Sequence, residues 1–182
     1  MGHVRLKTAP LRNHPQYNEK WLQNIIADDP GILGIGDVLL RDVERMHPGA
    51  GRLDLLLQEA DGYGRYEVEI QLGATDESHI IRTIEYWDIE RRRYPQYDHT
   101  AVIVAEDITS RFLNVIGLFN GFIPIMALQL TAVETAEGSS SPPYSTPCSS
   151  ATWTKTKRRR SRLTETIGRH SVAGRRRSSS QT

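Results

Sequence analysis

The sequence predicts an α/β fold, a mixed β-sheet flanked by helices in the order α-β-β-β-α-β-α-β. Two apolar runs around a turn-rich centre predict a β-hairpin at residues 51–73. Helical periodicity follows directly after the hairpin, and the continuous apolar run at residues 100–105 is typical of a buried central strand. The helix between these strands would cross over the sheet, so we expect a mixed sheet.

Before the hairpin, one helix and one strand are predicted. Residues 1–14 show no clear periodicity and are expected to form a flexible lead. A helix is predicted over residues 17–28, where the apolar side chains form one stripe, and Pro30 ends it. Residues 37–45 are predicted to form a strand, and His47, in the turn that follows, is expected to be exposed rather than a metal ligand.

After the hairpin, helices and strands alternate. Asp76 is predicted as the N-cap of a long helix with an apolar face toward the sheet and a charged, solvated face that includes Glu90. A second helix is predicted over residues 110–119, and residues 124–133 are predicted to form the closing strand. Residues 112–130 contain no charge, which raises the alternative of a membrane span, but Asn, Gly and Pro interrupt this stretch and favour a buried helix plus strand.

The hairpin carries an unusual polar face. Alternation along its second arm sends apolar side chains to one face and Glu67, Glu69 and Gln71 to the other. A turn near residues 61–62 pairs residues whose numbers sum to about 123, which places Asp54 opposite Glu69 or one position away. Two carboxylates and an amide are therefore expected on one patch of the sheet.

Carboxylates this close repel each other, and such pairs persist mostly where a cation neutralises them. A hard divalent ion, Mg²⁺ or Mn²⁺, would take one oxygen each from Asp54 and Glu69 and a third from the backbone carbonyl of Ile70. Gln71 would then contact the attacking water. The alternative is an exposed hairpin with a polar outer face, as in many alternating strands.

This arrangement resembles a known family. Asp54, a hairpin and then Glu69-x-Gln71 are similar to the signature of the PD-(D/E)XK nuclease superfamily, and GRLDLL followed by YEVEIQLG most resembles the NucS-type endonuclease domain. The resemblance covers about residues 17–130 of this chain. It implies a restriction-endonuclease-like core within residues 15–134, with Mg²⁺-dependent hydrolysis of DNA phosphodiester bonds as the activity.

Further site residues follow from the resemblance. Gln71 stands where the family usually has Lys, a change familiar from recombination-promoting nuclease/transposase relatives, and an amide orients water without supplying positive charge. Glu19 would face the metal, or would be a solvated first-turn acid favoured by the helix dipole. Independently of the resemblance, the helix directly after the strand of Glu69 would let Arg82, or Tyr86 on its flank, reach a substrate phosphate; the alternative is that Arg82 only pairs with neighbouring acids along its helix.

The composition indicates where the protein acts. The chain has 182 residues and a single cysteine, Cys148, which excludes an internal disulfide and fits a reducing compartment. The first residues lack the apolar core of a signal peptide, so a cytoplasmic protein with no membrane contact is expected. DNA is the expected partner, and a homodimer is left open.

The last part of the chain differs from the rest. Residues 1–134 contain 13 Lys/Arg and 20 Asp/Glu, a net charge of −7, whereas residues 135–182 contain 10 and 2, a net charge of +8. Serines and basic residues dominate this tail, so a disordered segment is predicted. A polybasic nucleic-acid arm is one interpretation, and a frameshift shortly after Val133 is the other.

Two functions other than an endonuclease stay open. The first is a non-catalytic nuclease-fold module that binds nucleic acid or a protein partner, because Gln71 replaces the usual Lys. The second is a pseudogene product, which would follow from a frameshifted tail.

Overall fold

The computed structural model describes residues 6–135 and 144–147, all within the first of two units, Met1–Thr152 and Trp153–Thr182. Its helices are α1 (Glu19–Asp28), the 3-10 helix η1 (Pro30–Leu33), α2 (Glu77–Arg93) and α3 (Ser110–Phe119). Its strands are β1 (Leu6–Ala9), β2 (Val38–His47), β3 (Gly51–Glu59), β4 (Gly64–Ala74), β5 (Asp98–Asp107), β6 (Ile125–Thr135) and β7 (Tyr144–Pro147).

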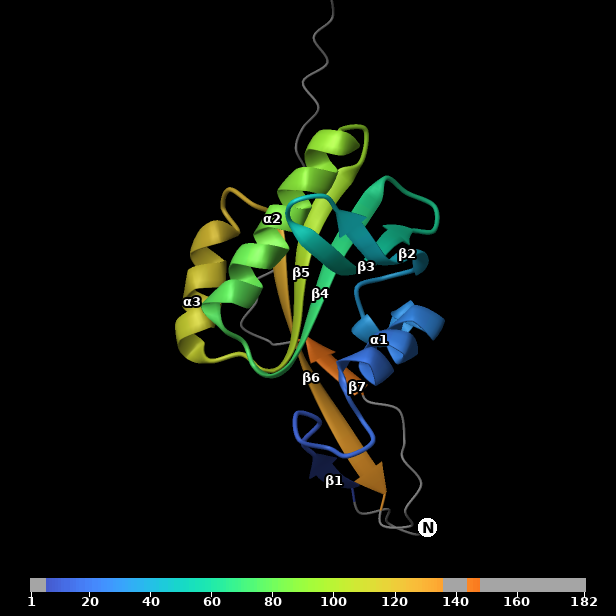
Figure 1. The fold of residues 1–182 in the computed structure, drawn as a ribbon, viewed down its shortest axis with the longest axis vertical. Helices are drawn as coiled ribbons and strands as arrows, with labels where there is room; N and C mark the ends of the chain where they lie inside the picture. The colour runs from blue at the N-terminus through green and yellow to red at the C-terminus, as the bar shows by residue number, and fades with distance from the viewer. Residues whose placement is uncertain (1–5, 136–143, 148–182) are drawn as a thin grey trace, which may run out of the picture. The chain divides into compact units, whose positions relative to one another are not determined.

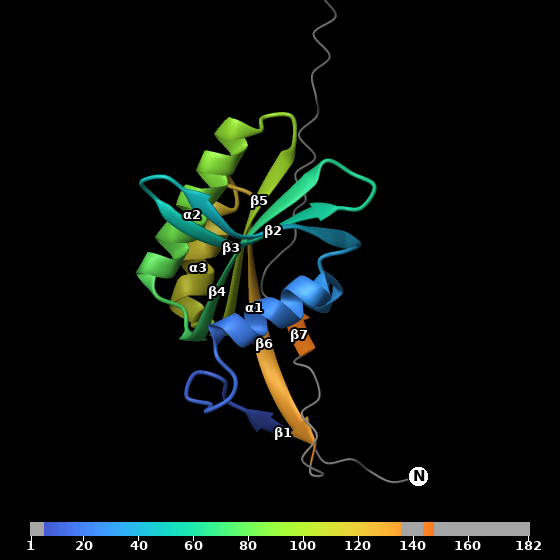
Figure 2. The ribbon, with the colours of Figure 1, turned by 45° about the vertical axis from the view of Figure 1, so that its right-hand side comes forward.

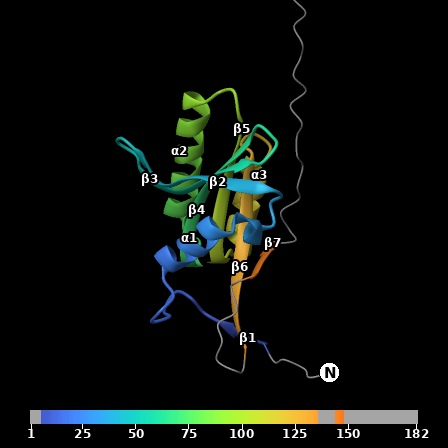
Figure 3. The same cartoon turned by 90° about the vertical axis from the view of Figure 1, so that its right-hand side faces the viewer.

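Seven strands of the described residues form one sheet in the order β1-β6-β5-β4-β3-β2, with β7 paired to β6. The pairs β2–β3 and β3–β4 are antiparallel, whereas β4–β5 and β5–β6 are parallel, so the predicted mixed sheet is confirmed. Helices α2 and α3 lie on one face and α1 lies on the other (Figures 1 and 2). β6 extends past the end of β5 to pair with β1 (Figure 3).

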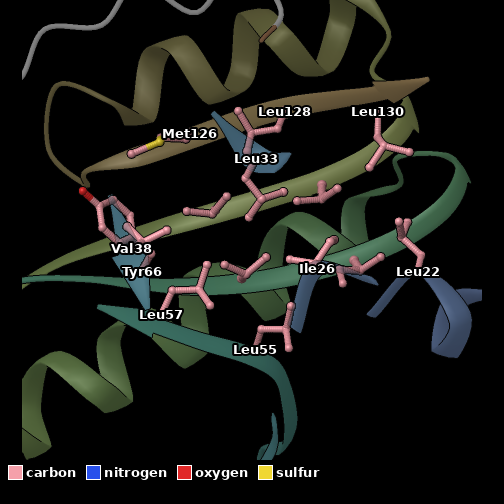
Figure 4. Close-up of a cluster of buried hydrophobic side chains, with 14 of the residues drawn as sticks. Leu22, Ile26, Leu33, Val38, Leu55, Leu57, Tyr66, Met126, Leu128 and Leu130 are labelled. Carbon is pink, nitrogen blue, oxygen red and sulfur yellow. The ribbon is translucent and has the colours of Figure 1, made fainter. Parts of the chain in front are cut away.

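A hydrophobic core fills each face of the sheet. On the α1 face, Leu22 and Ile26 pack over buried side chains of β3, β4, β5 and β6 (Figure 4). On the opposite face, α2 contributes Ile80 and Trp87, which pack against small residues such as Ala101 of β5. These side chains allow α2 to lie close to the sheet over β5 and the adjacent β4, the strand that carries Glu67 and Glu69.

The register of the predicted hairpin is confirmed. Leu55 pairs with Val68 and Leu56 with Glu67, so the next opposing residues toward the open end of the hairpin are Asp54 and Glu69. The predicted alternation also holds, because Val68 belongs to the core beneath α1 and Glu67 lies on the other side of the strand.

The structure differs from the predictions at both ends of the fold. β1 lies within the segment predicted to be a flexible lead, and β7 lies within the tail predicted to be disordered. Both strands pair with β6, which is distant from β1 in the sequence and directly precedes β7. The polybasic run at residues 155–162 lies outside the described residues.

Two polar residues predicted to be exposed are buried. His47 ends β2 and is 1% exposed, with its ring 5.3 Å from that of Tyr86. Glu90 is fully buried on α2 because its carboxylate accepts a hydrogen bond of 2.9 Å from Arg45 Nε. Both predictions were wrong because sequence periodicity does not show ion pairs between β2 and α2.

The segment without charged residues forms α3 and the first part of β6, as predicted. No helix in the described part of the chain has both the length and the apolar character that spanning a bilayer requires.

Glu106, on β5, ties the N-terminal segment to the sheet. Its carboxylate accepts the backbone N–H groups of Leu11, Arg12 (3.0 Å) and Gly73 (2.6 Å). We expect Glu106→Ala to lower the free energy of unfolding by about 3 kcal/mol, because hydrogen bonds to a charged acceptor are lost together. Urea denaturation measures this change, and Asp107→Ala, which removes the exposed neighbouring carboxylate, should leave stability nearly unchanged. Equal effects of the two variants would contradict the assignment.

Candidate functional site

Asp54 and Glu69 are joined across the β3–β4 hairpin at the point where its ladder ends. The backbone N–H of Asp54 donates to Glu69 Oε1 at 3.1 Å, and the backbone N–H of Ile70 donates to Asp54 Oδ2 at 2.8 Å. Each carboxylate thus accepts a backbone hydrogen bond from the opposite strand. This exchange brings together the two acids that the sequence predicted to lie opposite each other.

The two carboxylates raise each other's energy in their charged forms. Burial, followed by the negative charge of Asp54, raises the pKa of Glu69 to about 7. Burial also raises the pKa of Asp54, against the lowering effect of the Ile70 N–H and the Arg82 charge, and the nearby charge of Glu19 raises it further. A pair of acids in this environment favours a nearby cation.

Arg82 supplies positive charge on the α2 side. Its Nε lies 2.8 Å from Glu69 Oε2, and the Glu69 side chain is 1% exposed whereas that of Arg82 is 46% exposed. Arg82 therefore reaches from the surface to a buried carboxylate. Whether it also contacts a substrate phosphate stays a prediction.

Tyr86, the other predicted phosphate contact, is in the interior. It is 1% exposed, and its hydroxyl accepts a hydrogen bond of 3.0 Å from the backbone N–H of Arg52. Tyr86 therefore holds the start of β3 against α2 and is not available at the surface, which corrects the expectation that it lies on an open flank of its helix.

A pocket of about 170 Å³ lies beside Asp54. It contains three of the predicted site residues: Glu19, Asp54 and Ile70. Glu19 is held there because its Oε1 accepts the backbone N–H of Leu72 at 3.1 Å, which joins the start of α1 to β4. The other lining residues are Lys20, Gln23, Glu44 and Arg52.

Gln71 is directed elsewhere. Its Nε2 donates to Asp76 Oδ2 at 3.0 Å, and Asp76 is the N-cap of α2. Its Oε1 is buried without a hydrogen-bond partner among the described residues. Gln71 is not one of the side chains that line the pocket, so the structure does not bring the predicted amide to the predicted acids in this state.

Sequence reasoning missed four lining residues, three of which form one network with the backbone of Asp54. Gln23 Nε2 donates to the backbone carbonyl of Asp54 at 2.9 Å, and Lys20 Nζ donates to Gln23 Oε1 at 2.9 Å and to Glu44 Oε1 at 2.8 Å. The spacing of Lys20 and Gln23 places both on one helical face, which was the available signal. Their meeting with Glu44 depends on how α1 packs on the sheet.

The donor set fits a hard divalent cation in its chemistry. Carboxylate and carbonyl oxygens are the ligands that Mg²⁺ prefers, and Asp54 and Ile70 line the pocket. Glu69 adjoins Asp54 but does not line the pocket, and its two oxygens accept hydrogen bonds from the Asp54 N–H and from Arg82 Nε. Within the described residues, no three His, Cys, Asp or Glu side chains are grouped closely enough to hold a metal ion. A metal would therefore need water or substrate oxygens in addition to Asp54 and Glu69.

Comparison with known proteins supports the fold. No family model and no curated protein matches the sequence. A repair endonuclease from Pyrococcus abyssi has a similar structure, with a TM-score of 0.50 and 16% identity over 63% of this chain and 47% of that one. The protein in an EndoMS–dsDNA complex has a TM-score of 0.49 and 16% identity over 70% of this chain and 64% of that one.

The likeness to the Pyrococcus protein confirms the predicted restriction-endonuclease-like core as the fold of this chain. The chain spans about half the length of that neighbour. Assigning the activity of that neighbour to this chain is therefore a proposal.

Proposed function

We propose that this chain is a divalent-metal-dependent endonuclease that hydrolyses phosphodiester bonds in DNA. The observation that carries the proposal is the exchange of hydrogen bonds between Asp54 and Glu69 across the hairpin. The nuclease fold supports it, and the name of the Pyrococcus neighbour, a repair endonuclease, supports DNA as the substrate class.

Each residue has a distinct part in this proposal. Asp54, Glu69 and the Ile70 carbonyl would hold Mg²⁺ or Mn²⁺, which supplies Lewis-acid activation of water and phosphate. Glu19 adds negative charge beside Asp54, which strengthens cation binding. Gln71 would orient the attacking water only after its amide leaves Asp76. The cytoplasmic location and the homodimer stay predictions.

The decisive experiment is a cleavage panel of double-stranded, single-stranded, branched and modified DNA with Mg²⁺ or Mn²⁺. Wild-type protein should cleave at least one form, and Asp54→Ala should lower the rate by at least about 100-fold while the fold is kept. Circular dichroism checks the fold. Undiminished cleavage by Asp54→Ala would remove the assignment.

A non-catalytic nuclease-fold module is the second candidate, because the amide of Gln71 is engaged by Asp76. In this case the wild type binds DNA or a protein without cutting DNA. Activity that appears only in Gln71→Lys would favour this second candidate.

A further inference from the structure

The chain lacks a lysine at position 71, yet its pocket contains an ammonium group from another element. Lys20 of α1 lines the pocket together with Asp54 and Ile70. An ammonium has three donors, and two of those of Lys20 are used, at 2.8 Å to Glu44 Oε1 and at 2.9 Å to Gln23 Oε1. No partner for the third is found within residues 6–135 and 144–147.

The position of Lys20 is tied to the backbone of Asp54. Gln23, which accepts from Lys20, donates its own amide to the Asp54 carbonyl at 2.9 Å. Glu44 lies opposite Asp54 on β2, because the pairs on either side are Val43–Leu55 and Arg45–Leu53. Asp54 thus positions both partners of Lys20, Gln23 through its backbone carbonyl and Glu44 across the β2–β3 ladder. The Lys20 ammonium therefore has a fixed position relative to the Asp54 carboxylate.

Glu44 has an unusual backbone conformation. Its φ is 54°, and it is the single non-glycine residue with positive φ in the described part of the chain. Residues other than glycine rarely adopt this backbone conformation, and those that do so inside a strand are often held there for function. The carboxylate of Glu44 contacts Lys20 through Oε1 and Arg52 Nη1 through Oε2, the latter at 3.3 Å, so a strained residue orders the positive charge of the pocket.

We infer that Lys20 supplies the positive charge that a lysine at position 71 would supply, by contacting the scissile phosphate, and that Glu44 is its positioning residue. The inference rests on the proposed endonuclease function. Lys20 contributes a hydrogen bond and a charge that stabilise the phosphorane-like transition state, whose negative charge exceeds that of the bound diester. It transfers no proton in this role.

The test measures kcat and DNA affinity for Lys20→Met on the best DNA form with Mg²⁺. The kcat should fall by about 100-fold or more, the effect of removing one donor to a developing negative charge. DNA affinity should fall by less than about 5-fold, because a single phosphate contact is lost. Arg92→Gln is the matched control, since Arg92 is 76% exposed, pairs with Asp88 on α2 and carries the same charge.

Chemical rescue separates the ammonium from the fold. Because Cys148 is the one cysteine of the chain, Lys20→Cys in a Cys148→Ser background can be alkylated selectively with 2-bromoethylamine, which restores an ammonium at nearly the original length. Alkylation should recover at least about 10-fold of the lost kcat. Alkylation with iodoacetamide, which adds a neutral amide, should not.

Glu44→Gly tests the positioning role. Glycine adopts positive φ without strain, so the melting temperature should equal or exceed that of wild type. The kcat should nevertheless fall by about 10-fold or more, because Lys20 loses its carboxylate partner. A residue with only a structural role would not combine unchanged stability with lost activity.

The outcomes distinguish failure of the inference about Lys20 from failure of the proposed endonuclease function. A wild-type chain that cleaves no DNA form overturns both. Cleavage that depends on Asp54 but is as fast in Lys20→Met as in Arg92→Gln overturns only the role of Lys20. Rescue by the ammonium and not by the amide supports the inference.

Discussion

Glu69→Gln is expected to abolish metal-dependent cleavage and, in the absence of metal, to stabilise the protein at pH 8. Burial and the charge of Asp54 raise the pKa of Glu69 to about 7 from its ordinary 4.5. Ionising this group in the fold at pH 8 therefore costs about 3 kcal/mol, a value that already includes the favourable charge of Arg82, so the variant should gain about 3 kcal/mol. A neutral amide keeps the shape and an acceptor for the Asp54 N–H.

The sign of the pH dependence follows from the raised pKa. Wild-type protein has the full contribution of Glu69 below about pH 4.5 and loses it as the pH rises through about 7, whereas the variant has no group to ionise. Urea denaturation in EDTA at pH 4.5 and pH 8 should show a difference between the two proteins only at the higher pH. Glu77→Gln, at an exposed carboxylate at the start of α2, is the control. A variant less stable than wild type at pH 8 would contradict the strained pair.

Mg²⁺ should stabilise the wild type and not this variant. A cation that binds only the folded state raises the melting temperature according to its concentration relative to its Kd. Loss of that shift in Glu69→Gln, together with a higher metal-free stability, would show that the acids of the hairpin are kept for binding rather than for folding.

The acid pair could be predicted because its determinants are local. A short turn and strict alternation set the register of a hairpin, so Asp54 and Glu69 follow from their distance to residues 61–62. The long helices and central strands were predicted for the same reason, since each carries its own periodicity. The fold class then followed from the order of the elements.

The rest of the pocket depends on packing that no local pattern encodes. Lys20 and Glu44 meet because α1 crosses the face of the sheet beside β2, and nothing in either segment specifies this contact. The direction of Gln71 was missed since Asp76 was interpreted only as an N-cap, although its second oxygen also binds the amide. Charged residues were assigned to solvent by default, which failed for Glu90 because Arg45 neutralises it.

Assigning charged residues to solvent would also place Glu67 and His99 at the surface. They instead form a buried ion pair, and breaking this pair should have the largest effect on stability. Both side chains are fully buried, and Glu67 Oε1 lies 2.6 Å from His99 Nδ1. His99→Phe leaves the carboxylate of Glu67 without its partner, which should lower the free energy of unfolding by about 3 to 5 kcal/mol. Urea denaturation at pH 6 measures the loss.

A double variant distinguishes an unpaired charge from lost packing. Glu67→Leu combined with His99→Phe removes both polar groups, so it should recover most of the stability that His99→Phe loses. Although burial lowers the pKa of His99, the hydrogen bond and charge of Glu67 outweigh it and raise that pKa above 6.5. The contribution of His99 to stability is then complete below pH 6.5 and declines as the pH rises through its folded value, and this decline should be smaller in the double variant. If the double variant is as unstable as His99→Phe, the lost stability comes from the shape of the imidazole and not from the stranded carboxylate.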